Sequence, residues 1–223
     1  MKIMTQDEIN ARVAEFIARI NQSVTEAEQH LEVSSSTISS IPYDPDFIAT
    51  VKAYAVVEPM LNELIAKQMT GPDVPGITTP GRDEIYASFV VSLNMSGRAG
   101  KLRLAEELGL LTKERVVFIE ALSRVRNRYA HNVKNMHRSL VEILTDEQQH
   151  NKQIMKNLTG VDLSLSSSDD QRFLKFHIYY RLADYLADAL QILRPPPLPS
   201  GGLLGALFTE PPKASASESP SSS

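Results

Sequence analysis

Residues 112–131 read TKERVVFIEALSRVRNRYAH, and their apolar members recur at the spacing of an α-helix. Residues three, four and seven apart share one face of a helix with 3.6 residues per turn. Thr112 is of a type that caps helix starts. This stretch therefore predicts a helix with one apolar face and a polar C-terminal turn. The residues on its apolar stripe are Val116, Ile119, Leu122, Arg126 and Tyr129.

The same spacing extends outward in both directions, while no segment alternates as a strand would. Capping-box spacing of Thr5 with Glu8, and of Ser168 with Gln171, marks two helix starts. Pro45 suits a first turn, Pro59 predicts a kink, and Gly109 predicts a helix end. We therefore expect an all-α bundle of five to seven helices around one core. Helices are expected over 6–32, 45–65, 85–93, 102–108, 112–131, 136–144 and 168–193, with loops at 71–81 and 145–169, the latter holding one weak helix at most.

Three regions follow from composition. Residues 1–40 form an amphipathic helix and a Ser-rich linker, and residues 41–194 form the helical domain. Residues 195–223 hold seven prolines and seven serines, too little apolar surface to offset the entropy of ordering, so a disordered tail is expected. The apolar segment 203–208 is either an incidental feature of that tail or a docking motif. The first helix must cover either the domain core or a partner chain.

Composition also limits the kind of site. The chain has 223 residues, a net charge of −4 and no cysteine, which excludes disulfides, cysteine nucleophiles and cysteine metal sites. The first residues turn polar at once, and no apolar run nears the ~20 residues of a membrane span, so we expect a cytoplasmic protein without a membrane partner. No metal and no cofactor are expected, because the histidines lack metal-ligand spacing. They are His30, His131, His137, His150 and His177.

The candidate chemistry lies at the end of the 112–131 helix, in Arg126, Asn127 and His131. Arginine fits phosphate oxygens, and histidine transfers protons near neutral pH. Residues five apart lie ~140° around a helix and ~7.5 Å along it, whereas Asn127 and His131, four apart, lie on one face. Arg126 therefore needs a partner or an opening on the apolar stripe. A cleft between two copies of this helix would supply such an opening.

Local charge favours a polyanion. Residues 113–138 contain seven Lys or Arg against two Glu, a net of +5, and the candidate RNA-binding residues are Arg124, Arg128, Lys134 and Arg138. The alternative is a solvated helix face in which Arg124 and Arg128 pair with Glu120.

Two further residues are open to interpretation. Glu58 either orients Arg126 or His131 or is an ordinary surface carboxylate, and His177 is expected to be a packed histidine.

Two stretches carry a resemblance to a known family. Residues 97–111, GRAGKLRLAEELGLL, and residues 125–132, VRNRYAHN, resemble the HEPN superfamily (higher eukaryotes and prokaryotes nucleotide-binding), and within it mannitol-repressor-like proteins. The shared pattern is K-x-x-x-A-x-x-L-G-L-[IL], followed by a helix ending in R-N-x-x-A-H. The resemblance covers roughly residues 47–145.

The resemblance implies an all-α bundle that dimerises. Catalytic members are metal-independent endoribonucleases with an R-x4-6-H motif, whose three places are filled here by Arg126, Asn127 and His131. His131 would be the general acid or base, Arg126 would stabilise the phosphorane, and Asn127 would hold His131 or a phosphate oxygen. The RNA 2′-hydroxyl would be the nucleophile.

Two functions stay open at this point. The first is a ribonuclease acting as a toxin or phage-defence effector, with RNA and an antitoxin as partners. The second is a non-catalytic regulatory or scaffold protein that acts through protein contacts. No helix-turn-helix signal supports direct DNA repression.

Overall fold

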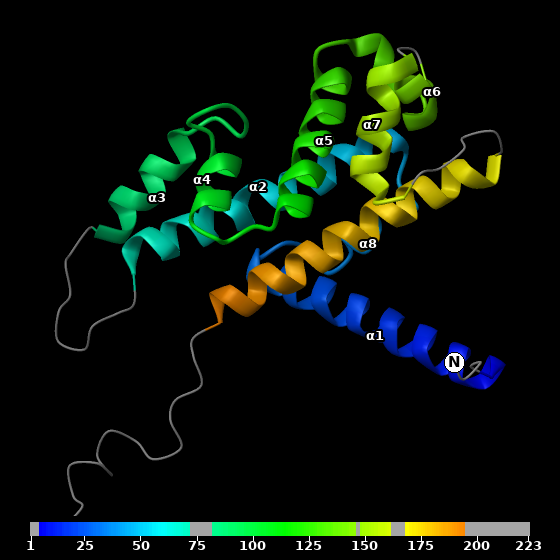
Figure 1. The fold of residues 1–223 in the computed structure, drawn as a ribbon, viewed down its shortest axis with the longest axis horizontal. Coiled ribbons are helices and arrows are strands. Elements are labelled where there is room, and N and C mark those ends of the chain that lie inside the picture. The colour runs from blue at the N-terminus through cyan, green and yellow to red at the C-terminus, as the bar shows by residue number, and fades with distance from the viewer. Residues whose placement is uncertain (1–4, 72–81, 146–147, 162–167, 195–223) are drawn as a thin grey trace, which may run out of the picture. The chain divides into compact units, whose positions relative to one another are not determined.

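The structure, a computed structural model, describes residues 5–71, 82–145, 148–161 and 168–194, without the side chains of residues 82, 148–151 and 168–172. Every regular element in these ranges is helical, which confirms the all-α prediction (Figure 1). The elements are α1 (Gln6–His30), α2 (Asp46–Thr70), α3 (Arg82–Ser92), α4 (Lys101–Glu107), α5 (Lys113–Ala130), the 3-10 helix η1 (Val133–His137), α6 (Leu140–Thr145), α7 (Gln148–Thr159) and α8 (Ser168–Leu193).

Local signals fix several helix ends where the sequence predicts them. Thr5 and Glu8 form a capping box at the start of α1, and Thr112 Oγ1 accepts from the Arg115 amide at the start of α5. Such bonds satisfy amides that have no partner within the helix. Gly109 follows α4 with φ +70°, a conformation that favours glycine. α2 continues through Pro59, where the proline removes one backbone bond.

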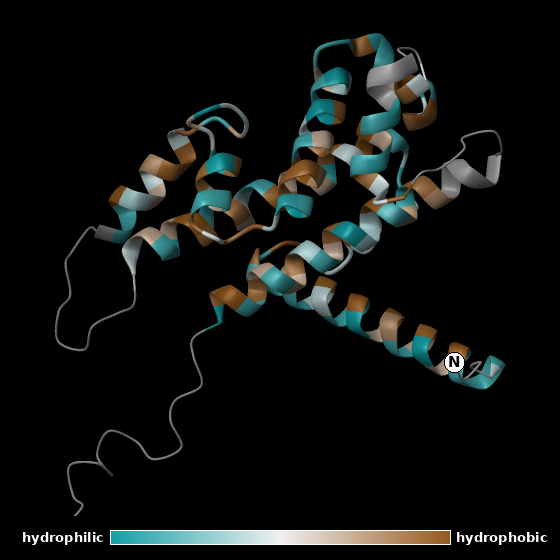
Figure 2. Cartoon of the chain, in the orientation of Figure 1, coloured by the Kyte–Doolittle hydropathy of each residue, from teal (hydrophilic) through white to brown (hydrophobic). Residues whose placement is uncertain are grey.

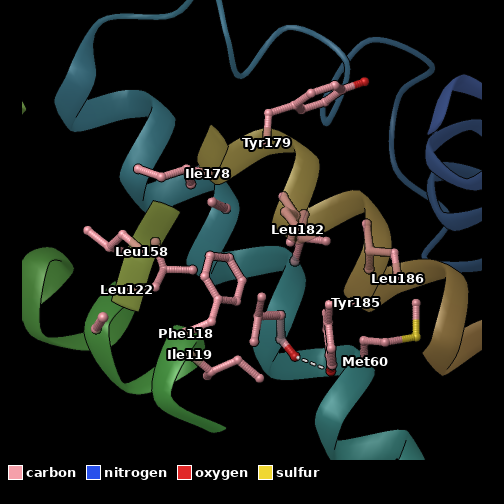
Figure 3. Close-up of a cluster of buried hydrophobic side chains, with 14 of the residues drawn as sticks. Met60, Phe118, Ile119, Leu122, Leu158, Ile178, Tyr179, Leu182, Tyr185 and Leu186 are labelled. Carbon is pink, nitrogen blue, oxygen red and sulfur yellow. Dashed lines mark hydrogen bonds between the residues drawn. The ribbon is translucent and has the colours of Figure 1, made fainter. Parts of the chain in front are cut away.

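The core lies where α2, α5 and α8 meet, with α7 packed against α5 and α8. Met60 of α2, Phe118 and Leu122 of α5, and Leu182 of α8 are buried together (Figure 3). The fully buried Tyr185 donates its hydroxyl to the Val57 carbonyl at 3.4 Å, which satisfies a polar group inside an apolar cluster. The helices belong to one compact unit that ends at Leu193.

α1 contributes to this core through only half of its length. Its C-terminal half buries Ile20, Val24 and Ala27, and α1 packs along α8. The N-terminal half is exposed, although apolar residues recur along the whole helix (Figure 2). The first helix therefore covers the domain core with its C-terminal half and leaves the other half of its apolar stripe uncovered.

One segment differs from expectation. Residues 148–159, assigned to a polar loop with a weak helix at most, form the twelve-residue helix α7. Ile154, Met155 and Leu158 are buried in it, so packing on α5 stabilises a helix whose own sequence is mostly polar. With α7, the described residues contain eight α-helices rather than five to seven. Of the loop expected at 71–81, only Gly71 is described, as the C-cap of α2. The Ser168–Gln171 cap, the tail and the 203–208 segment lie outside the described residues or side chains.

In the turn before α4, the backbone at Gly100 passes very close to the backbone of Ser96. A Cβ on Gly100 would lie 2.7 Å from the Ser96 carbonyl carbon and 2.8 Å from its oxygen, closer than side chains approach backbone. Gly100→Ala should therefore lower the free energy of unfolding by about 1–3 kcal/mol, as overpacking does. Urea unfolding followed by circular dichroism measures it. Ala99→Ser, at the exposed neighbouring position, should change stability by less than about 0.5 kcal/mol. Equal stability of the two variants would contradict the close approach.

Candidate functional site

The predicted site residues lie at the C-terminal end of α5. The helix ends at Ala130, and the amide of His131, its C-cap, donates to the Asn127 carbonyl at 2.9 Å. The chain then turns into η1. His131 is exposed. Its imidazole is therefore accessible to a ligand at the surface.

An open hollow of about 520 Å³ lies along this end of α5. Its walls bring together four of the predicted residues and one from α7: Arg124, Asn127, Arg128, His131 and Ile154. The four α5 residues are spaced three, one and three apart, which places them on one face of the helix. The α7 wall was not anticipated, because that segment had no clear helical pattern. Two arginines, an amide and an imidazole in one open hollow suit an anionic ligand.

Arg126 does not line this hollow. Its guanidinium stacks over the ring of Tyr54 in α2, with Cζ 5.0 Å from the ring centroid. Its Nη1 also donates to Asn127 Oδ1 at 3.1 Å. The half-buried position fits its place beside the apolar stripe, where a stacked aromatic ring and a hydrogen bond replace water. The structure thus groups Asn127 with His131 and links Arg126 to them only through Asn127.

A partly buried ion pair lies beside Tyr54. Lys101 Nζ bonds Glu58 Oε1 at 2.9 Å, and the lysine side chain is 2 % exposed while that of Glu58 is 39 % exposed. Burial, followed by the charge of Glu58, raises the pKa of the Tyr54 phenol above 10, against smaller opposing effects of Ser123 and Arg126. Tyr54 is therefore neutral at physiological pH and serves as an aromatic platform. Glu58, which sequence reasoning offered as a partner for Arg126 or His131, instead neutralises Lys101.

The remaining predicted cations have separate surroundings. Arg124 Nη2 lies 4.0 Å from Glu120 Oε2. Arg128 donates a hydrogen bond to the Ile143 carbonyl at 3.2 Å, and Arg138 donates one to the Glu142 carbonyl at 3.1 Å. Lys134 is exposed on η1. The basic stretch is interrupted at its start, because Arg115 pairs with Asp184 at 2.5 Å and Asp188 at 2.9 Å. Lys113 is exposed at the start of α5, whereas the other four cations lie in the C-terminal turns of α5 and in the segment that follows.

His177 and His30 lie away from this hollow. His177 in α8 is half-buried, and burial lowers the pKa of its imidazole below 6.5, as expected for a packed histidine. His30 Nε2 lies 2.7 Å from Glu63 Oε2 and joins α1 to α2.

Among the residues that the structure describes, no group of three or more His, Cys, Asp or Glu side chains could hold a metal ion. None of the described helices has the apolar length needed to cross a membrane.

Comparisons with protein-family models, with curated proteins and with solved structures gave no match.

The stacking of Arg126 on Tyr54 can be measured by a double-mutant cycle. Tyr54→Leu and Arg126→Met should each destabilise the protein, with a coupling energy of about 0.5–1 kcal/mol in urea unfolding. Tyr54→Phe retains the ring and should retain the coupling. A coupling near zero with Tyr54→Leu would mean that the guanidinium does not use the ring.

Proposed function

We propose that the hollow beside α5 binds RNA through its phosphate groups and cleaves it without a metal ion. Arg124 and Arg128 contact phosphate oxygens, and His131 and Asn127 act at the scissile phosphodiester. The support for this proposal is the grouping of these four side chains around one open hollow. The HEPN resemblance, still a proposal, leads to the same reaction.

The chemistry needs one proton acceptor near the reacting atoms. His131 accepts the proton of the RNA 2′-hydroxyl, whose oxygen attacks the neighbouring phosphorus. The bond from phosphorus to the 5′-oxygen breaks, that oxygen takes a proton from a water molecule, and the proton held by His131 neutralises the hydroxide that is left. The products are a 2′,3′-cyclic phosphate and a 5′-hydroxyl. Arg128, on the same face as His131, stabilises the added negative charge of the phosphorane.

Arg126 has a positioning role in this proposal. Because its guanidinium donates to Asn127 Oδ1, the two donor hydrogens of the Asn127 amide are free to serve a phosphate oxygen or the imidazole. Stacking on Tyr54 in turn fixes the guanidinium. Direct contact of Arg126 with the phosphorane would require a shared groove between two copies of α5, and that composite site remains a prediction. The toxin or phage-defence role and the antitoxin partner are likewise predictions.

A second candidate function is that of a non-catalytic regulatory or scaffold protein. The observation that favours it is the exposed N-terminal half of α1, where Phe16 and Ile17 are open to solvent. Large apolar side chains gathered on one exposed helix face are typical of protein contact sites. The two functions are separable, because they use different helices.

Binding predicts a particular salt dependence. Arg124→Ala should reduce the slope of log affinity against log salt by about 0.7 for single-stranded RNA, the value for one lost phosphate contact. Fluorescence anisotropy with a labelled single-stranded RNA, over a range of salt, measures the slope. Arg103→Ala is the matched control, since Arg103 lies on α4 and its side chain is 56 % exposed against 53 % for Arg124. Equal slopes for both variants would place the RNA elsewhere.

The proposed mechanism predicts that the rate of cleavage, but not the affinity for RNA, depends on His131. His131→Ala should reduce the cleavage rate by about 10²–10⁴-fold in the presence of a chelator, while RNA affinity stays within about threefold. His137→Ala, on the exposed side of η1, should cleave at the wild-type rate. A substrate with 2′-deoxyribose at the scissile position should remain intact. If the wild-type protein binds RNA but leaves every RNA uncut, the ribonuclease is excluded and the non-catalytic function is favoured.

A further inference from the structure

The N-terminal half of α1 presents an apolar stripe that the described fold leaves about half exposed. All residues from Gln6 to Arg19 are exposed. The stripe consists of Ile9, Val13, Phe16 and Ile17, each 41–50 % exposed, within an arc of about 100° around the helix. The same stripe continues into the buried half of the helix. One amphipathic pattern thus runs along α1 and is used by the fold over only half of its length.

A helix of this kind needs tertiary contacts. Isolated helices shorter than about 12–15 residues are marginal in water, and helices in proteins derive most of their stability from packing of the apolar face. The capping box at Thr5 stabilises the end of α1, but it does not cover the stripe. A surface that buries the stripe would therefore stabilise the helix as well as the contact.

α8 adds to the same exposed surface. Phe16 packs against Tyr180, with ring centroids 5.6 Å apart, and the two helices separate toward their N-terminal ends (Figure 1). Ile9 precedes Phe16 by seven residues, and Phe173 precedes Tyr180 by seven, so both lie on the facing sides of the separating helices. Phe173 is 57 % exposed.

The exposed area suits a dimer. Five side chains of roughly 200 Å² each, about half exposed, present on the order of 500 Å² of apolar surface. A standard interface buries about 800 Å² per partner, of which about 56–65 % is apolar. The apolar share of that area is about the area that this surface exposes.

The charged residues of α1 favour one relative orientation of two paired α1 helices. Glu8, Arg12, Glu15 and Arg19 follow one side of the helix in alternating sign, within an arc of about 60° that begins about 40° beyond the stripe. In an antiparallel pair of identical helices this side faces its own counterpart. A two-fold axis near Val13 then sets Arg12 opposite Glu15 of the second copy, and Glu8 opposite Arg19. A parallel pair would instead place these residues against the opposite side of the stripe, which carries Asn10, Asn21 and the carboxylate of Asp7.

We propose that α1 pairs antiparallel with α1 of a second copy, and that this isologous contact makes the protein a homodimer. Val13 lies beside the two-fold axis, and Phe173 of α8 packs against the stripe of the other copy. The interface differs from the pairing of two α5 helices that would form a cleft around Arg126. It also does not depend on the proposed RNA cleavage.

The mass in solution tests the contact. The full chain, of 24.7 kDa, should sediment at twice that mass at micromolar concentration. Val13→Glu and Phe16→Glu should each raise the dimer dissociation constant by about 100-fold or more, because a carboxylate would be buried without a partner. Ile85→Glu, an equally drastic change at a 67 % exposed position of α3, should leave the dimer intact. Circular dichroism verifies that each variant keeps its helices.

Charge exchange distinguishes the antiparallel contact from a general loss of folding. Arg12→Glu alone and Glu15→Arg alone should each weaken the dimer by about 3–10-fold, since each places like charges opposite one another. The double variant R12E/E15R restores opposite charges and should recover wild-type affinity. A monomer at 100 µM would overturn the proposal. A dimer insensitive to Val13→Glu and Phe16→Glu, or a double variant weaker than both single ones, would overturn it as well.

Discussion

The burial of one face of α5 is the constraint on which the rest of the site depends. Phe118, Leu122 and Val125 are almost fully enclosed by neighbouring helices, and Tyr129 continues this face. A helix rotated by even one residue would bring cations into that enclosure, at a cost of several kcal/mol each. The apolar contacts therefore fix which side of α5 faces the solvent. They present Asn127 and His131 together because these residues share the opposite side.

The residues of the stretch GRAGKLRLAEELGLL serve this constraint rather than the candidate site. Gly100 lets the chain pass close to the backbone of Ser96, and the following lysine enters the interior to meet Glu58. Removing one partner of such a pair would leave the lysine charge buried without compensation. The pair joins α4 to α2 beside Tyr54, and Tyr54 supports the guanidinium of Arg126. One half of the resemblance thus builds the frame, and the other half carries the candidate site.

The sequence was sufficient for features set by neighbours along the chain. Helical periodicity, the caps at Thr5 and Thr112, and the stop at Gly109 depend on local contacts and were predictable. Helix α7 was not predictable, because its buried residues span little more than one turn and its stability comes from packing on α5. The separation of Arg126 from His131 followed from helix geometry. The stacking of Arg126 on Tyr54 could not be predicted in this way. The two residues are more than seventy positions apart, and the docking of α2 on α5 brings them together.

The hollow and the uncovered stripe lie on different helices, and this has a consequence for assembly. The hollow is formed by α5 and α7, whereas the stripe lies on α1 and Phe173 lies on α8. A two-fold axis through α1 involves none of the side chains that line the hollow, so each copy would keep its own complete set. A site shared between two α5 helices would need a second, different axis. Two identical basic hollows held in one dimer would bind a long polyanion at two points, and the second contact would then be intramolecular and stronger than a single hollow provides.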